Sequence, residues 1–483
     1  MNLPPVVDVH WGQLAPAITL LATAVVTLLL ALWQKDSRQV AATALLGIVT
    51  AFVFNLTAFL GEREALGSFG LRFLADTPAL AFNFVLLLGA ALAVLVSYDQ
   101  LPRMHLDHPE YYPLMLLSTL GAMVMVAAGD LVTLVLGLEI MSLAVYVLSA
   151  WRTRSRQSEE AGMKYFLLGA FGSAILIYGM ALTYGATGAF VYGDIVAALD
   201  GGGLPLLATL GGALVLAGLA FKASLAPFHQ WAPDVYTGAP TIVTTFMTVV
   251  VKAAAFAAVL RLVATVLPQL SPWLLTALAV SVAATLVIGN LAALRQRGVK
   301  RMLAYSAVAH AGYLGLAVLG TGHGGVEAAI WYLTAYTLMN VGAFAVLTMV
   351  VDSSDQGDDI ERFAGLGQER PWLAFALTFF LLSLGGIPPL AGFVGKVMVF
   401  QSAIDAGYLW LAVLGIVTSV IALVYYFRVV AVMYFRKPEY QPQSFRSAAS
   451  SLAIGVAFAG TVLLGLLPGW WHGALFVVGQ LPR

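Results

Sequence analysis

Apolar runs long enough to cross a lipid bilayer recur along the whole chain of 483 residues. A membrane-spanning helix needs about 20 consecutive apolar residues, because the hydrocarbon core of a bilayer is about 30 Å thick. Such runs start near residues 14, 40, 78, 111, 130, 162, 204, 241, 272, 302, 325, 371, 408 and 449. The sequence therefore predicts an all-α polytopic membrane protein with about fourteen transmembrane helices. Within residues 111–150 two runs could fuse into one, since only "AAGD" separates them.

The composition agrees with a membrane protein and excludes several classes of site. Only 10% of the residues are charged and 60% are hydrophobic, whereas a soluble domain carries about 25% charged residues. The absence of cysteine excludes disulfides, cysteine-ligated zinc and iron–sulfur clusters, and thiol catalysis. The net charge of zero gives no electrostatic case for nucleic acid. The N-terminal "MNLPPVVDVHWGQLAPA" lacks the basic segment of a cleaved signal peptide, so the first run is expected to remain as a span.

Basic residues are distributed unevenly between the loops on the two sides of the predicted bundle. With the N-terminus outside, the loops predicted inside contain Lys35, Arg38, Arg103, Arg152, Arg154, Arg156, Arg295, Arg297, Lys300, Arg301, Arg362, Arg370, Arg436, Lys437 and Arg446. The loops and terminus predicted outside contain Arg63, Arg72 and Arg483. Because cytoplasmic loops are rich in Lys and Arg, this asymmetry predicts an even number of spans with both termini outside.

The longest polar loop is "DSSDQGDDIERFAGLGQERP", near residues 352–371. It is short and acidic, and we expect it to be a surface connector. No segment has the length and composition of a soluble domain.

Two apolar segments are interrupted by proline and carry a lysine nearby. They are "AFKASLAPFHQW" (220–231) and "LGGIPPLAGFVGKVMVF" (384–400), and the lysine precedes the proline in the first and follows it in the second. The segments lie about five spans apart, and an odd offset gives them opposite orientations in the membrane. Inverted repeats with broken helices are common in ion-translocating membrane proteins. The similarity is weak, so from this pattern alone a repeat and a chance pair both stay open.

Several ionisable residues remain inside predicted spans: Glu139, Lys164, Lys222, Lys252, His310 and Lys396. A charge at the centre of a bilayer costs at least about 2.5–3.5 kcal/mol, so such residues face the protein interior or water and commonly mark an ion path. Burial lowers the pKa of a lysine, and a nearby carboxylate raises it again. A lysine whose partner can approach or retreat is therefore predicted to be a switchable proton site.

The lysines differ in how well a structural role would explain them. Lys252 lies about eleven residues into its run, where the side chain is too deep to reach the interface easily. Lys222 precedes Pro227, which breaks the helix and frees backbone groups that suit a hydrated cavity. Lys222 could instead extend to the interface, and the same alternative holds for Lys164 at the start of a span.

The second broken segment places its lysine after a proline pair. Pro388 and Pro389 are expected to unwind the helix locally, and Lys396 follows them. This position favours a functional lysine.

The remaining ionisable residues have plain alternatives as well. Glu139 could be a structural carboxylate satisfied by hydroxyls or could pair with a lysine across a helix interface. His310, in "LAYSAVAHAGYLGL", could be a hydrogen-bonded core residue or a proton relay near neutral pH. Asp234 is expected to cap or link helix ends, and His229 in the same loop could line a point where protons enter. The motifs HExxH, Walker A and GxGxxG after a strand are absent, so no metal or cofactor site is predicted.

Three stretches together carry a family resemblance: "FKASLAPFHQWAPDVYTGAPTIVTTFMT", "KRMLAYSAVAHAGY" and "LSLGGIPPLAGFVGK". With them the chain resembles the antiporter-like proton-pumping subunits of respiratory complex I, over nearly its whole length. The wording "PDVYTGAPT" and the lysine at position 396 look like the N branch of this family in bacterial NADH–quinone oxidoreductase. The M branch usually has a glutamate at the position of that lysine.

The resemblance implies a fold of two inverted five-helix repeats, each with a broken helix. Residues 1–110 would hold the first three transmembrane helices. Residues 111–270 would form the first repeat and residues 271–436 the second, and residues 437–483 would hold a C-terminal transmembrane helix.

The resemblance also implies a proton path. In the family, a glutamate on the fifth helix pairs with a lysine on the broken seventh helix, and the sixth helix often carries another lysine. A lysine on the eighth helix connects the halves, and a histidine on the tenth and a lysine on the broken twelfth continue the path. In helix order, these positions match Glu139, Lys164, Lys222, Lys252, His310 and Lys396.

The implied function is that of a non-redox subunit in a proton-translocating NADH–quinone oxidoreductase. The chain itself would bind no cofactor, and NADH, FMN, iron–sulfur clusters and quinone would belong to partner subunits. The expected partners are other membrane subunits of the complex, such as the antiporter-like M and small subunits such as K, together with the lipid bilayer and protons. The expected location is the bacterial plasma (inner) membrane, with both termini on the periplasmic side.

Three other functions stay open. A subunit of a multi-subunit sodium/proton antiporter would use much the same buried charges without a quinone reductase. A structural membrane scaffold would use the charges only to hold helices together. A quinone-binding redox subunit has no sequence element in its favour.

Overall fold

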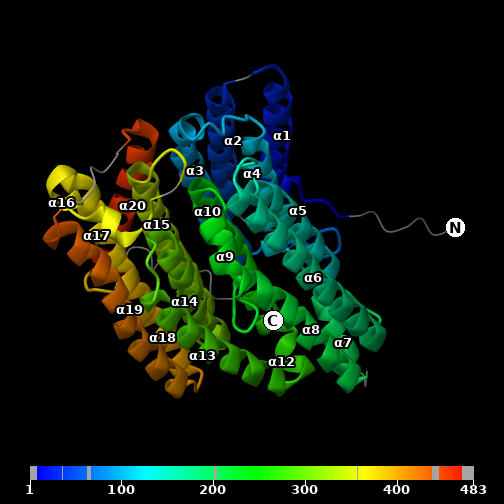
Figure 1. Ribbon diagram of the computed structural model, residues 1–483. Helices are drawn as coiled ribbons and strands as arrows, with labels where there is room; N and C mark the ends of the chain where they lie inside the picture. The colour runs from blue at the N-terminus through cyan, green and yellow to red at the C-terminus, as the bar shows by residue number, and fades with distance from the viewer. Residues whose placement is uncertain are drawn as a thin grey trace.

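The computed structural model describes residues 8–34, 36–61, 67–200, 204–355, 357–437 and 445–469. These residues are almost entirely helical (Figure 1). Twelve of the helices are long and apolar enough to cross a membrane, and two shorter apolar helices accompany them. The predicted all-α polytopic fold is confirmed. Of the residues used to predict the topology, Lys35, Arg63 and Arg483 lie outside the described parts of the chain.

The helices follow the predicted runs closely. The N-terminal part contains α1 (Trp11–Trp33), α2 (Ser37–Leu60), a small antiparallel hairpin of β1 (Gly67–Ser68) and β2 (Phe73–Leu74), and α3 (Thr77–Arg103). Next come α4 (Tyr111–Val126), α5 (Leu131–Ser149), α6 (Arg156–Thr187), α7 (Tyr192–Asp200), α8 (Pro205–Ala223), α9 (Trp231–Gly238), α10 (Thr241–Phe246), the π-helix η1 (Met247–Val251), α11 (Lys252–Thr265) and α12 (Leu267–Leu270). The last part contains α13 (Pro272–Leu294), α14 (Val299–Leu319), η2 (Thr321–His323), α15 (Gly325–Val350), η3 (Ile360–Phe363), α16 (Leu366–Glu369), α17 (Pro371–Gly385), α18 (Ala391–Asp405), α19 (Leu409–Phe435) and α20 (Ala448–Leu466).

The pair of runs within residues 111–150 forms two helices, because the backbone turns between them. Asp130 adopts an extended backbone before α5, and its carboxylate accepts a hydrogen bond from the Thr133 amide at 2.5 Å. Such a cap satisfies one of the amides that the start of a helix leaves without a partner.

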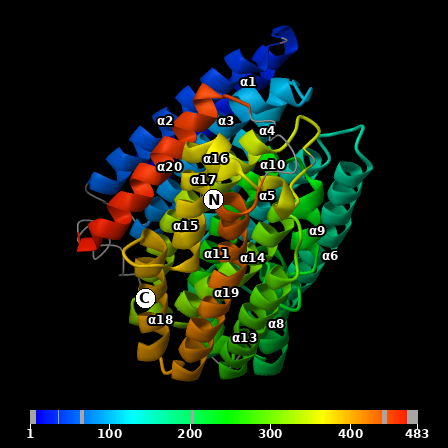
Figure 2. The same ribbon diagram turned by 60° about the vertical axis from the view of Figure 1, so that its left-hand side comes forward.

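Three elements form the centre of the bundle. In the continuous helix of α10, η1 and α11 and in the helix α15, every residue of the most apolar 18-residue stretch is buried. In α14, 94% of the residues in that stretch are buried. Both views show these helices in the middle, with α1, α2 and α6 toward the edges (Figures 1 and 2). The edge helices expose large apolar side chains, as expected where lipid or another subunit would cover them.

The same packing pattern occurs in the two predicted repeats. The hairpin of α4 and α5 corresponds to the hairpin of α13 and α14. In the same way, α6 packs along the broken pair α8–α9, and α15 packs along the broken pair α17–α18. These contacts agree with two five-helix repeats, whose boundaries at 111–270 and 271–436 stay predictions.

Two of the basic residues predicted to face inside, Arg103 and Arg436, lie at the same end of the bundle. There Arg103 donates to the carbonyls of Thr348 and Val351 at the end of α15, at 2.8 and 2.7 Å. Arg436, after α19, forms an ion pair with Glu361 in the loop that follows α15. The structure thus places Arg103 and Arg436 on one side of the bundle, and the side of the membrane stays a prediction.

The acidic loop near residues 352–371 is more than the surface connector that the sequence predicted. The side chain of Asp355 is only 7% exposed and forms an ion pair with Lys300 at 3.2 Å. The loop therefore packs into the bundle, and the prediction failed because composition alone does not reveal which carboxylate of a polar loop has a buried partner.

A buried ion pair at the opposite end of the bundle yields a stability prediction. Both terminal nitrogens of the Arg261 guanidinium, Nη1 and Nη2, donate to Asp76, at 2.6 and 2.8 Å, and both side chains are less than 10% exposed. We expect Arg261→Ala to lower the free energy of unfolding by about 3–5 kcal/mol, because the buried carboxylate loses its oppositely charged partner. Denaturation in detergent would measure it.

The control is Arg436→Ala at the exposed pair with Glu361, for which we expect about 0–1 kcal/mol. Equal effects of the two variants would contradict the prediction.

Candidate functional site

The first helix break lies between α8 and α9. Helix α8 ends at Ala223, Ser224 has a left-handed backbone with φ of 59°, and α9 begins at Trp231. Pro227 and His229 lie in this break. His229 is buried, and its Nδ1 has no hydrogen-bond partner among the residues that the structure describes.

Side chains satisfy the backbone groups that this break leaves free. The amide of Ala226 donates to the Thr285 hydroxyl at 2.8 Å, and the Ser281 hydroxyl donates to the Ala226 carbonyl; both hydroxyls belong to α13. The indole of Trp231 donates to the Phe221 carbonyl at 2.9 Å. A membrane protein tolerates a broken helix when such partners replace the missing helical hydrogen bonds.

Lys222 lies in the last turn of α8 and is 3% exposed. Its ammonium donates to the hydroxyl of Tyr146 on α5 at 3.3 Å. It also lies 4.9 and 4.8 Å from the ring centres of Tyr146 and of Tyr165 on α6. Two aromatic faces and one hydroxyl therefore hold the buried charge, and such cation–π contacts are strongest where water is excluded.

Glu139 lies on the same helix as Tyr146, the residue that contacts Lys222. The residue is on α5, seven positions before Tyr146 (139 and 146), so the two lie two turns apart on one helix face. The Glu139 carboxylate interacts electrostatically with both Lys222 and Tyr146. Among the described residues, no ion pair within 4.0 Å joins Glu139 and Lys222. Tyr146, rather than the predicted carboxylate, is the direct partner of the lysine.

Lys252 is the first residue of α11 and follows directly on the π-helix η1. The side chain is 1% exposed, and its ammonium donates to the carbonyl of Ala307 on α14 at 2.7 Å. His310 is one helical turn further along α14. π-helical turns are rare and frequently occur at functional sites.

His310 is surrounded by hydroxyl groups from two other helices. Its Nδ1 lies 2.7 Å from the hydroxyl of Tyr332 on α15, and its Nε2 lies 3.4 Å from the hydroxyl of Tyr426 on α19. The Tyr426 hydroxyl also contacts the Ser306 hydroxyl at 2.5 Å. Both ring nitrogens thus have a partner that can donate or accept a proton.

Lys396 lies next to this group at the second helix break. Its ammonium donates to the Gly385 carbonyl at 2.8 Å and to the Ser419 hydroxyl at 2.7 Å. It lies 4.8 Å from the ring centre of Tyr313, whose ring is 5.6 Å from that of His310. The structure therefore brings Lys252, His310 and Lys396 into one connected cluster, in which Tyr313 lies beside both His310 and Lys396, and Lys252 is connected through the backbone of α14.

The two breaks place their lysines alike in spite of the different sequence order. Gly385 is the last residue of α17, so Lys396 reaches back across Pro388 and Pro389 to the C-terminal end of the first half-helix. Lys222 belongs to the last turn of its own half-helix. A positive charge is favourable at both places, because the C-terminal end of a helix carries a partial negative charge.

Lys164 lies apart from the buried lysines. Its side chain is 41% exposed and pairs with Glu160 at 2.8 Å and with Asp234 at 3.1 Å. Asp234 also accepts from Arg301 at 2.9 Å. Asp234 thus links α6, α9 and α14, as the sequence led us to expect of a residue that joins helix ends.

Sequence reasoning missed most of the tyrosines of the cluster. The spacing of Tyr146 from Glu139 was a usable signal, because both fall on one helix face. Tyr426 is 116 positions from His310 along the chain, and only the packing of α19 against α14 brings them together.

Comparison with known proteins places these residues in a family. The family model described as NADH:quinone oxidoreductase/Mrp antiporter, TM, matches residues 128–422. The NADH-quinone oxidoreductase subunit N of Trichlorobacter lovleyi is 43% identical over 441 residues, which cover 90% of this chain and 89% of that protein. The chain belongs to this family.

Solved structures of NADH:quinone oxidoreductase/Mrp antiporter proteins share the fold. A chain of respiratory complex I from Thermus thermophilus, solved with bound aureothin, is 38% identical with a TM-score of 0.80. The alignment covers 94% of this chain and 97% of that one. A chain of the Mrp complex from Dietzia sp. has a TM-score of 0.84 at 21% identity, covering 98% and 97% of the two chains. The latter likeness concerns the fold alone.

The first break yields a prediction for the stability of the site. We expect Thr285→Val to lower the free energy of unfolding by about 1–3 kcal/mol, because the buried Ala226 amide loses its acceptor while the side chain keeps its shape. The control is Thr57→Val at an exposed threonine that bonds within its own helix, with a change of about 0.5 kcal/mol or less. Thermal unfolding of the two purified variants would compare them, and an unchanged Thr285→Val would refute the prediction.

Proposed function

We propose that the chain is a proton-translocating subunit of the membrane arm of an NADH–quinone oxidoreductase, equivalent to subunit N. The observation that carries the proposal is the buried series of Lys222, Lys252, His310 and Lys396 in the centre of a membrane bundle. Ionisable side chains at this depth are costly and commonly form ion paths. The 43% identity to a subunit N over 90% of the chain supports the same function.

In the proposed mechanism, the Glu139 carboxylate controls Lys222. When the carboxylate is close, it favours the charged lysine, and when it moves away, the proton is released more easily. Tyr146 contacts the ammonium directly, so it can transmit a movement of the Glu139 carboxylate to Lys222.

The second part of the path runs through the connected cluster. A proton at Lys252 reaches the surroundings of His310, which is one turn beyond the Ala307 carbonyl that the lysine contacts. The hydroxyls of Tyr332 and Tyr426 can each donate and accept, so they can pass a proton at either ring nitrogen. Lys396 then receives the charge beside Tyr313.

The proposal assigns a non-redox role to this chain. NADH, FMN, iron–sulfur clusters and quinone would be bound by other subunits, and the energy of quinone reduction would arrive as a structural or electrostatic change. The proposed neighbours are membrane subunits of the complex, such as M and K.

The proposed location is the bacterial plasma (inner) membrane with both termini periplasmic, which puts the basic end of the bundle on the cytoplasmic side. In this scheme Lys164, in its exposed ion pairs, and His229, in the first break, would lie near the points where protons enter.

The second candidate is a subunit of a multi-subunit sodium/proton antiporter. Its support is the shared fold with the Mrp chain, at 21% identity. The greater identity to complex I chains favours the first function. Affinity purification of the chain from native membranes separates the two, since only a complex I subunit brings NADH–quinone reductase activity with it.

The central lysine provides the main test of the proposed function. We expect Lys252→Ala to lower NADH-driven proton pumping per assembled complex about tenfold or more, because a positioned proton-transfer group contributes about 10²–10⁴-fold. Proton uptake by membrane vesicles, normalised to assembled complex, is the measurement. Lys437→Ala, at an exposed lysine, is the matched control. Normal pumping in an assembled Lys252→Ala complex would support the scaffold function instead.

Tyr146 provides a finer test. We expect Tyr146→Phe, which keeps the ring beside Lys222 and removes only the hydroxyl, to lower pumping about tenfold, because a hydrogen bond to a charged group contributes about 1.5–3 kcal/mol. Tyr178→Phe, at a tyrosine that is 61% exposed, should leave the same vesicle assay unchanged. If both variants pump normally, the hydroxyl has no part in the path.

A further inference from the structure

The start of the central helix lacks a cap from its own chain segment. Thr241 is the first residue of α10, and Pro240 before it provides no side-chain cap. The first amides of a helix have no partner within the helix, and burying them unpaired is unfavourable. Every residue of this helix from Thr241 to Val263 is buried, so water is a poor substitute.

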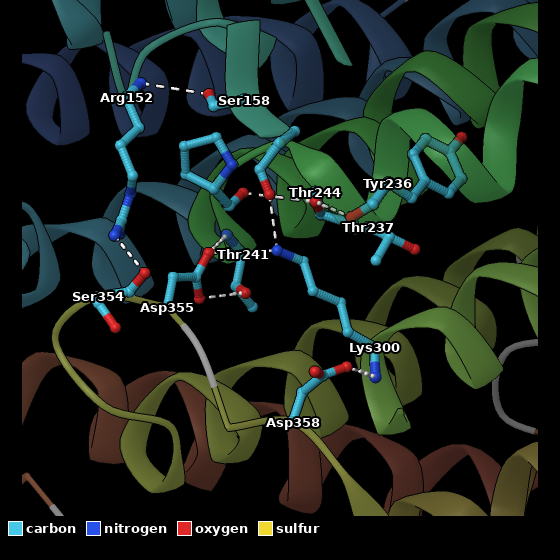
Figure 3. Close-up of polar contacts among 12 residues, drawn as sticks. Arg152, Ser158, Tyr236, Thr237, Thr241, Thr244, Lys300, Ser354, Asp355 and Asp358 are labelled. Carbon is cyan, nitrogen blue, oxygen red and sulfur yellow. Dashed lines mark hydrogen bonds and ion pairs between the residues drawn. The ribbon is translucent and has the colours of Figure 1, made fainter. Parts of the chain in front are cut away.

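A carboxylate from the acidic loop fills this place. Asp355 accepts from the Thr241 amide at 2.8 Å and from the Thr241 hydroxyl at 2.6 Å, across 114 positions of sequence. Figure 3 shows the Asp355 side chain directed at Thr241 from the loop below it. The contact reproduces the usual N-cap with a residue from elsewhere in the fold, and the negative charge lies at the positive end of the helix.

Lys300 fixes this carboxylate in place. Its ammonium lies 3.2 Å from Asp355 and donates to the Ala239 carbonyl at 2.6 Å. Its amide donates to Asp358 in the same loop at 3.1 Å. Figure 3 shows Lys300 between the loop and the start of α10. Lys300 therefore joins the loop, the chain before α10 and the first turn of α14.

The same two helices meet again at the central lysine. Lys252 is eleven residues after Thr241, and Ala307 is seven residues after Lys300 (241 and 252, 300 and 307). The contact between Lys252 and Ala307 thus lies about 10–16 Å deeper along helices whose ends Asp355 holds together. The depth and rotation of α10 set where the Lys252 ammonium meets α14.

We propose that Asp355 is a positioning residue for Lys252: by capping α10 from the acidic loop, it holds the lysine at the Ala307 carbonyl, one turn before His310. The inference rests on the proposed function, because it assigns Lys252 a part in proton transfer. Without the cap, the π-helix η1 between Thr241 and Lys252 is the place where the helix can change its register.

The test uses the intact complex in membrane vesicles and compares two carboxylates of one loop. Asp355→Ala should lower proton pumping per assembled complex about tenfold, since a misplacement of about 1 Å can cost up to about a hundredfold. Asp359→Ala, which removes the same charge at an exposed position that caps only η3, should pump normally. Asp355→Glu, which keeps the carboxylate, should restore at least half of the lost rate.

A merely structural role gives a different result. It lowers the amount of assembled complex and leaves the pumping rate per complex unchanged, and that outcome overturns the inference. Equal pumping in Asp355→Ala and Asp359→Ala overturns it as well. If Asp355→Ala does not assemble, Thr241→Pro replaces it, because proline suits the first position of a helix but removes the amide and the hydroxyl from which Asp355 accepts; normal pumping in that variant is then the refuting outcome.

A variant in which the charges of Asp355 and Lys300 are exchanged tests whether Asp355 acts as a helix cap or only through its attraction to Lys300. The double variant Asp355→Lys, Lys300→Asp restores an opposite-charge pair but puts a cation at the start of α10, where it is unfavourable. We expect it to pump no better than Asp355→Ala, and full recovery would show that attraction alone suffices. Lys252→Ala is assayed in parallel: if it pumps normally, the proposed function fails, whereas a normal Asp355→Ala beside an impaired Lys252→Ala refutes only this inference.

Discussion

The burial of one continuous helix, from α10 through η1 to α11, is the constraint on which the rest of the structure depends. A helix that is buried over all but its last two residues must have nearly every polar group satisfied by neighbouring protein. The structure meets this demand at three levels: Asp355 at the start, Ala307 opposite Lys252, and Asp76 opposite Arg261 near the end. Each partner comes from a different element, so the helix binds the bundle together.

Much of the fold could be predicted from the sequence, because hydrophobic length is a strong signal in a membrane protein. Every predicted run has a helix that begins within six residues of it; the largest difference is at α6, which begins at Arg156 instead of near residue 162. The acidic loop was interpreted too simply, since nothing local distinguishes Asp355 from the exposed Asp359. A buried pair between Asp355 and Lys300 depends on tertiary packing, which a single sequence does not contain.

The charged residues of the candidate site could be predicted from the sequence, but most of their contacts could not. Lysines inside apolar runs are conspicuous because of their cost, and the structure brings Lys252, His310 and Lys396 into one cluster. The hydroxyl partners, above all Tyr146 and Tyr426, were not anticipated, since tyrosine is ordinary in an apolar helix. The resemblance to a family supplied a Glu139–Lys222 pair, and the structure adds that a tyrosine contacts the lysine directly.

The hydroxyls of Ser281 and Thr285 tie the first break to a helix of the other predicted repeat. Both lie on α13 and hold the backbone of Ala226. A change in the shape of this break therefore has to shift α13 or exchange its hydrogen bonds. Helix α13 also forms a hairpin with α14, the helix that carries His310. The two halves of the bundle are in this way joined by hydrogen bonds. A movement that starts near Lys222 would be passed through α13 to α14 in the far half.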